Sequence, residues 1–216
     1  GGVTTANDTV LLHQTVAGGL TVIAREGDIA PGRDGNPLAD SAKFTSFGNP
    51  VHGPAGKLAF IASLKAGSNK SGLFWVDGAA PLRLIARAGD PAPLLGTFSK
   101  FTNLVFRNTT NGTPIFKAKL ATQSVAKVNS ATSDGIWALN NAGDVVVVAR
   151  NGSYTYLNSN LYGTTSSISA LLSTAGSPGA EHGLDGDGSV RIHGTISNLA
   201  SPGKKKAQFP VPIPQP

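Results

Sequence analysis

The chain has 216 residues, of which only 14% are charged, and it carries a formal net charge of +6 at pH 7. It contains no cysteine, which excludes thiol nucleophiles, zinc-thiolate sites and a disulfide framework. No apolar run approaches the roughly 20 residues that a membrane-spanning helix needs, so no transmembrane segment is predicted. The positive charges are scattered apart from Lys204 to Lys206, and we therefore expect no nucleic-acid partner.

The composition is typical of an exported β protein rich in turns. Glycine is abundant, with 27 residues, and charged residues are scarce. The chain begins with Gly1-Gly2 and contains no methionine, so we expect that its initiator was lost, either by processing after export or through an engineered start of the chain. We therefore expect an extracellular or cell-surface location.

One pattern recurs along the chain at a nearly fixed spacing. Residues 23–31 return as residues 85–93, and a shorter third copy covers residues 148–152. Self-similarity of this kind marks stacked or radially arranged supersecondary units. Repetition favours a structural role for the shared positions, with the aspartates accepting backbone N–H groups in a turn. These positions are Arg25, Gly27, Asp28, Pro31, Arg87, Gly89, Asp90, Pro93 and Arg150.

Short apolar runs bounded by Gly, Asn, Asp or Pro predict strands throughout the chain, and no run predicts a helix. One complete unit is expected to have strands near residues 43–51, 57–64, 72–76 and 82–87. A second has strands near 100–106, 113–120, 135–139 and 145–150. The predicted fold class is all-β, with four-stranded antiparallel, propeller-like repeat units of about 62 residues. A three-sheet prism stays open as an alternative.

Half units are expected at both termini. Residues 9–13 and 20–25 correspond to the last two strands of a unit, and residues 166–172 and 189–196 correspond to the first two. The predicted organisation is an N-terminal half repeat (1–25), two repeat units (26–87 and 88–150), a C-terminal half repeat (151–200) and a Lys/Pro-rich tail (201–216). We expect this tail to be a solvated segment.

The chain resembles a family of secreted bacterial tandem-repeat proteins of the choice-of-anchor type, which carry an Asn-x-x-Gly-x-x-Ala-Phe motif. Residues 56–60 match the second half of this motif, and residues 112–116 match it with Ile for Ala. Asp185, Gly188 and Ile192 form a degenerate third copy. The resemblance implies export, a propeller-like all-β fold and no established catalytic activity.

Half units leave strand edges exposed, and exposed edges are templates for pairing. We expect the halves to complete each other between subunits, giving a homo-oligomer or a homopolymer. The predicted function is a secreted structural protein that assembles head to tail into a surface filament. The alternative is an extracellular propeller-like module that binds a glycan or a protein. The expected assembly residues are Leu11, Leu20, Val22, Ile168, Leu171, Val190 and Ile192.

Candidate catalytic and metal sites are few. Asp185 and Asp187 resemble the opening of a calcium loop, but Ile196 stands where such a loop needs its glutamate, and a hairpin explains the neighbouring glycines equally well. The four histidines show no metal-ligand spacing, and no nucleophile or phosphate-loop motif is present. Trp75 and Trp137 lie on predicted strands and are expected in the core. We therefore predict no enzyme, no cofactor and no metal.

Overall fold

The computed structural model describes residues 2–5, 7–14, 18–65, 71–93, 96–106, 112–124, 128–158, 161–170, 190–198, 204–211 and 213–214. These residues form antiparallel sheets and one three-residue 3₁₀ helix, η1 (Pro54–Gly56), so the all-β prediction is confirmed. Within the described part of the chain, no helix is long and apolar enough to cross a membrane. Contacts divide the chain into two compact units, Gly1–Asp90 and Pro91–Pro216.

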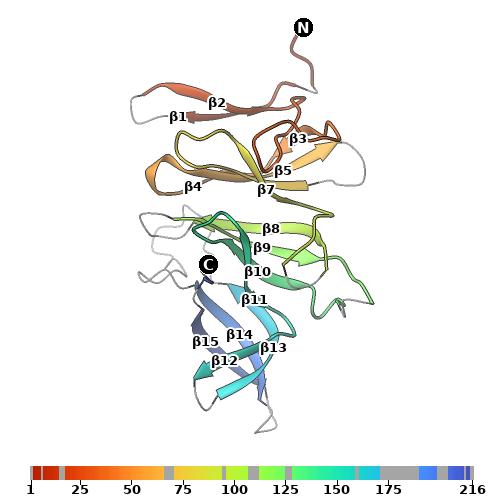
Figure 1. Cartoon of the computed structure of the whole chain (residues 1–216), viewed down its shortest axis with the longest axis vertical. Coiled ribbons are helices and arrows are strands. Elements are labelled where there is room, and N and C mark those ends of the chain that lie inside the picture. The colour runs from red at the N-terminus through yellow and green to blue at the C-terminus, as the bar shows by residue number, and fades with distance from the viewer. Residues whose placement is uncertain are drawn as a thin grey trace. The chain divides into compact units, whose positions relative to one another are not determined.

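The first unit contains a two-stranded sheet, β1-β2, and a larger sheet in the order β3-β5-β6-β7, with β4 also paired to β5 (Figure 1). Its strands are β1 (Val10–Gln14), β2 (Leu20–Arg25), β3 (Lys43–Phe47), β4 (Val51–His52), β5 (Leu58–Lys65), β6 (Ser71–Val76) and β7 (Arg83–Arg87). The single strand predicted over residues 43–51 is divided into β3 and β4. Pro50 lies at the break, where it has no N–H to donate to a ladder.

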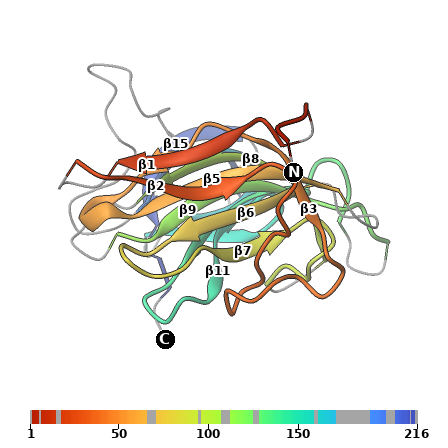
Figure 2. The same ribbon diagram turned by 90° about the horizontal axis from the view of Figure 1, so that it is seen from above.

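Three phenylalanines on neighbouring strands form the centre of the first core. The rings of Phe60 and Phe74 are stacked with centroids 5.7 Å apart, and the ring of Phe44 lies 5.0 Å from that of Phe74. Leu11 and Ala24 of the β1-β2 hairpin belong to the same buried cluster. One side of the hairpin therefore packs on the larger sheet, whose strands β5, β6 and β7 lie side by side in Figure 2.

The second unit contains two four-stranded sheets, in the orders β11-β10-β9-β8 and β12-β13-β14-β15. Its strands are β8 (Phe98–Phe106), β9 (Pro114–Leu120), β10 (Asp134–Leu139), β11 (Val145–Arg150), β12 (Tyr154–Asn158), β13 (Leu161–Ala170), β14 (Val190–Asn198) and β15 (Lys204–Val211). Trp137 stacks on Phe116 at 6.2 Å and meets Phe98 edge-on at 5.2 Å. This aromatic cluster parallels the one in the first unit.

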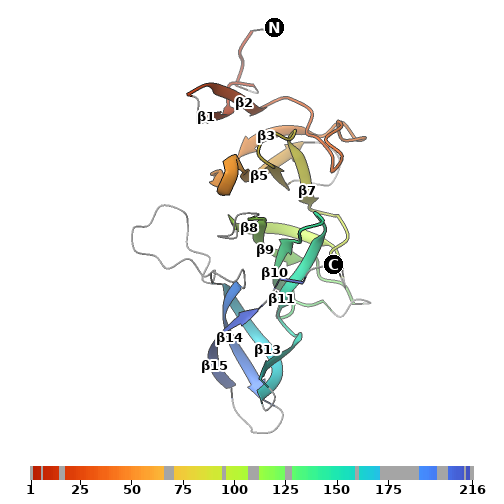
Figure 3. The same cartoon turned by 60° about the vertical axis from the view of Figure 1, so that its left-hand side comes forward.

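The C-terminal segment differs from the expected solvated tail. Residues 204–211 form β15, which pairs along its whole length with β14 (Figure 3). The physical reason is that the edge of β14 presents unpaired backbone groups, and the nearby chain satisfies them. The two strands predicted at the C-terminus correspond to β13 and β14, and β12 and β15 extend them on either side.

Three hairpins share one register and one irregularity. In each, the first strand pairs antiparallel with the second, and the register shifts one residue after the pair that contains the arginine. The arginine pairs are Val10 with Arg25, Gly72 with Arg87 and Gly135 with Arg150. The shifts fall between Leu11 and Leu12, between Leu73 and Phe74, and between Ile136 and Trp137. A bulge at a fixed place twists the strands locally and places the next side chain on the same face each time.

Candidate functional site

A tight turn closes each of these hairpins immediately after its arginine. The backbone N–H three residues later donates to the arginine carbonyl, at 3.2 Å for Asp28, 3.0 Å for Asp90 and 3.1 Å for Ser153. The glycine between them has a positive φ of 88°, 99° and 79° at Gly27, Gly89 and Gly152. Only glycine adopts this conformation without steric cost. The recurring arginine-to-aspartate pattern therefore corresponds to a turn in the structure.

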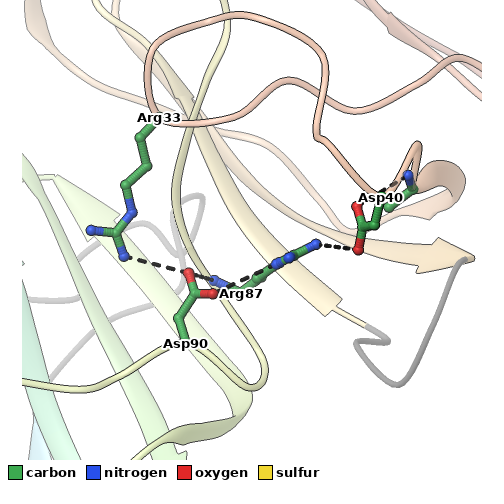
Figure 4. A network of polar contacts seen from close by, with 5 residues as sticks. Arg33, Asp40, Arg87 and Asp90 are labelled. Carbon is green, nitrogen blue, oxygen red and sulfur yellow. Dashed lines mark hydrogen bonds and ion pairs between the residues drawn. The ribbon is translucent and has the colours of Figure 1, made fainter.

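Around the second turn, charged side chains form a network (Figure 4). Asp90 accepts a hydrogen bond from the backbone N–H of Arg87 at 3.0 Å and lies 3.4 Å from the Arg33 guanidinium. Arg87 reaches Asp40 at 2.7 Å and Asp90 at 3.6 Å. The network ties the loop between β2 and β3 to the end of β7. Neither Arg33 nor Asp40 carries a local sequence signal for this contact.

The pKa of Asp40 lies below its ordinary value. Partial burial raises this pKa, but the hydrogen bond and the charge of Arg87, together with the hydrogen bond that the backbone N–H of Ala42 donates, lower it by more in total. A lowered folded-state pKa means that the carboxylate contributes stability above its unfolded-state pKa and loses it as the pH falls through the folded value. The contribution is small because the Asp40 side chain is 36% exposed.

The other two turns lack this arrangement. Arg25 and Asp28 are exposed, and among the described residues no ion pair joins them. At the third turn Ser153 replaces the aspartate, and Nη1 of Arg150 is buried without a hydrogen-bond partner. The carboxylate that holds Arg87 is thus specific to the second copy of the pattern.

We expect Asp90→Asn to destabilise the first unit by about 1.5 kcal/mol, the lower end of the range for a hydrogen bond to a charged group. The amide loses its charge interaction with both Arg33 and Arg87. Urea unfolding followed by circular dichroism measures the change. Asp28→Asn, the matched change at the exposed copy, is expected to shift stability by less than about 0.5 kcal/mol. Equal effects at both positions would show that the network does not stabilise the fold.

The β1-β2 hairpin has an exposed apolar surface, which consists of Leu12, Leu20 and Val22, with exposed fractions of 49%, 68% and 58%. Leu12 pairs with Val22 as Phe74 pairs with Leu84 in the β6-β7 hairpin. Phe74 is fully buried and Leu84 is 6% exposed. The same register positions are therefore covered in one hairpin and uncovered in the other.

The seven expected assembly residues occupy different environments. Leu20 and Val22 are exposed on β2, whereas Leu11 is buried in the core of the first unit. Ile168 on β13 is 5% exposed. Val190 and Ile192 lie on β14 opposite Val211 and Phe209, and Leu171 lies outside the described residues. Sequence reasoning missed Leu12, although its position one residue after Leu11 matches that of Phe74 after Leu73.

The β1-β2 hairpin also has an unpaired strand edge. Among the described strands, β1 pairs with β2 alone, so its other edge is unpaired. In the sheets of β3 to β7 and β8 to β11, the corresponding edges of β6 and β10 pair with β5 and β9. A further strand can therefore pair with the free edge of β1.

The calcium candidates Asp185 and Asp187 lie outside the described residues. Within the described ones, no group of three or more histidine, cysteine, aspartate or glutamate side chains lies close enough to hold a metal ion. Trp137 is fully buried and Trp75 is partly exposed, with the Lys57 ammonium 5.9 Å from its ring.

Comparisons with known proteins identify a family without identifying an activity. No curated protein and no solved structure matches the chain. The model of DUF7453, a family of unknown function, matches residues 1–195. This match covers most of the chain, which therefore belongs to the DUF7453 family of unknown function.

Proposed function

We propose that this protein is an exported, non-catalytic structural subunit whose copies join head to tail by completing each other's sheets into a surface filament or polymer. The observation that carries the proposal is the exposed apolar surface of the β1-β2 hairpin. Leu12 and Val22 stand where Phe74 and Leu84 are buried. A second copy of the chain is the expected partner, because its C-terminal strands correspond to the first two strands of a unit and the β1-β2 hairpin corresponds to the last two.

The shared hairpin register supports the proposal that the chain is built from propeller-like repeat units. The four-stranded meander of β8 to β11 has the strand number of a propeller blade. The cross-strand pairs Phe60 with Phe74 and Phe116 with Trp137 occupy matching places in the two larger meanders. On this proposal, β1 and β2 are the third and fourth strands of a repeat unit, as β6 and β7 are in the first unit.

Burial of this apolar surface favours association. Full burial of a leucine or valine side chain contributes about 1.5–3 kcal/mol, and the surface offers three such side chains, each about half exposed or more. A strand added to the β1 edge contributes backbone hydrogen bonds as well. The surface therefore favours a partner that supplies both a strand and an apolar cover.

Deleting residues 1–19 tests the proposal because it removes β1 and leaves β2 without a hairpin partner. We expect the full chain to form particles or fibres that grow with concentration, as measured by sedimentation velocity and negative-stain microscopy. The truncated chain is expected to stay monomeric, with the β-sheet spectrum of the second unit retained. A full chain that is monomeric at every concentration, or a truncated chain that assembles equally well, would contradict the proposal.

A further inference from the structure

We propose that β14 of a second copy is the receiving site for the β1-β2 hairpin, and that β15 is a placeholder strand which the incoming β1 displaces. The inference rests on the proposed function and deepens it by naming the two edges that pair. It follows from the registers of β13, β14 and β15, which match those of the other sheets.

The pair β13-β14 has the register of the first two strands in both larger meanders. Phe44 pairs with Leu64, Phe98 with Leu120 and Thr165 with Ile196, and the register shifts after each of these pairs. The turn that enters the sheet also matches. The N–H of Gly27 donates to the carbonyl of Phe44 at 2.9 Å, and the N–H of Gly152 donates to that of Thr165 at 2.7 Å. β14 therefore corresponds to β5 and β9.

β6 and β10 are the third strands of their units and pair with β5 and β9, and β15 pairs with β14 in the corresponding place. Four residues before Leu64, Leu120 and Ile196 stand Phe60, Phe116 and Ile192, which pair with Phe74, Trp137 and Phe209 respectively. Leu12 occupies the position of Phe74 and Trp137 within its own hairpin. β1 and β15 therefore match the same edge of β14 in the same register, with Leu12 taking the place of Phe209.

β15 is poorly suited to hold this place. Pro210 has no N–H, so either the ladder to β14 or the outer edge of β15 lacks a donor at that point. Lys204, Lys205 and Lys206 are consecutive, and lysines with proline are features that protect an edge from further pairing. Among the described strands, none pairs with the outer edge of β15, whereas β7 and β11 pair with the outer edges of β6 and β10.

β1 is better suited because it contains no proline and brings β2 with it. The incoming hairpin fills the third and fourth positions together. In the receiving unit, five of the six residues of β11 are only partly buried, and four of these are apolar: Val145, Val146, Val147 and Ala149. In the first unit, Ala24 of β2 and Leu84 of β7 share one buried cluster, and the same packing would place Val22 of the incoming hairpin beneath β11. Exchange thus covers apolar surface on both copies.

The absence of cysteine makes a disulfide lock an unambiguous test. Ile192 and Phe209 are Cα partners across β14 and β15, so the double variant Ile192→Cys, Phe209→Cys places two thiols within bonding reach. Oxidation would fix β15 on β14. We expect loss of polymer in the oxidised variant and its return on addition of a reductant, with the two single variants assembling under both conditions.

A second arm maps the new pairing directly. Leu12→Cys and Ile192→Cys chains are purified separately, mixed under assembly conditions and oxidised. We expect a disulfide between the two chains. A mixture of Leu12→Cys with His193→Cys, which shifts the register by one residue to the opposite face, is expected to give none.

The outcomes separate this inference from the proposed function. If the wild type polymerises and the oxidised lock polymerises equally well, or if Leu12→Cys does not link to Ile192→Cys, the exchange at β14 is wrong and assembly through another surface stands. If the wild-type chain does not polymerise at all, the proposed function fails, and the exchange fails with it.

Discussion

Replacing Val22 by aspartate is expected to abolish assembly while leaving the stability of the folded chain unchanged within about 0.5 kcal/mol. Val22 is 58% exposed, so the carboxylate of an aspartate at this position stays hydrated in the monomer. In a completed sheet the same side chain would lie against another copy, where an unpaired charge is costly to bury. Sedimentation velocity measures assembly, and urea unfolding measures stability.

The matched substitution Leu84→Asp is expected to have the opposite effect. Leu84 holds the same register position in the β6-β7 hairpin but is 6% exposed in the first core. A buried, uncompensated carboxylate costs about 3–5 kcal/mol, so the first unit is expected to unfold at a markedly lower urea concentration. The pair of variants therefore distinguishes a covered position from an uncovered one.

Thr21→Asp is the control for charge, because it adds the same carboxylate to β2 at a neighbouring exposed position. Side chains alternate between the two faces of a strand, so this change is expected to leave assembly intact. If Thr21→Asp and Val22→Asp inhibit assembly equally, net charge and not the apolar surface governs association. If neither inhibits it, the hairpin surface is not the interface.

The regular part of the fold was predictable because its signals are local. The short apolar run in residues 58–64 predicts a strand over residues 57–64, and the runs around residues 72–76, 82–87 and 145–150 are likewise apolar and bounded by turn residues. β15 was not predictable in this way. Its lysines and prolines resemble a solvated tail, and only the unpaired edge of β14 explains why they form a strand.

The candidate site was predictable where it repeats and not where it depends on distant contacts. Leu20 and Val22 follow from the position of the first hairpin, whereas the burial of Leu11 depends on the side of the hairpin that packs on the larger sheet. The contact of Arg87 with Asp40 joins residues 47 positions apart. A repeat comparison finds equivalent positions, but it does not find partners that only one copy possesses.

Truncating Trp137 to alanine is expected to destabilise the second unit by about 3–5 kcal/mol, because it leaves a large cavity in a packed core. The indole is fully buried and stands against Phe98 and Phe116. Urea unfolding followed by far-ultraviolet circular dichroism measures the loss, since the substitution removes one of only two tryptophans.

Trp137→Phe is expected to cost less than about 1.5 kcal/mol, as a conservative change of core shape does. Phe74 already fills the matching position of the first unit and stacks on Phe60. The phenyl ring also removes the indole Nε1, which is buried without a hydrogen-bond partner, and an unsatisfied buried donor costs about 1–3 kcal/mol. The lost volume and the relieved donor therefore offset each other. If Trp137→Phe destabilises the unit as much as Trp137→Ala, the two aromatic positions are not equivalent, and the structural argument for matching registers fails at this pair.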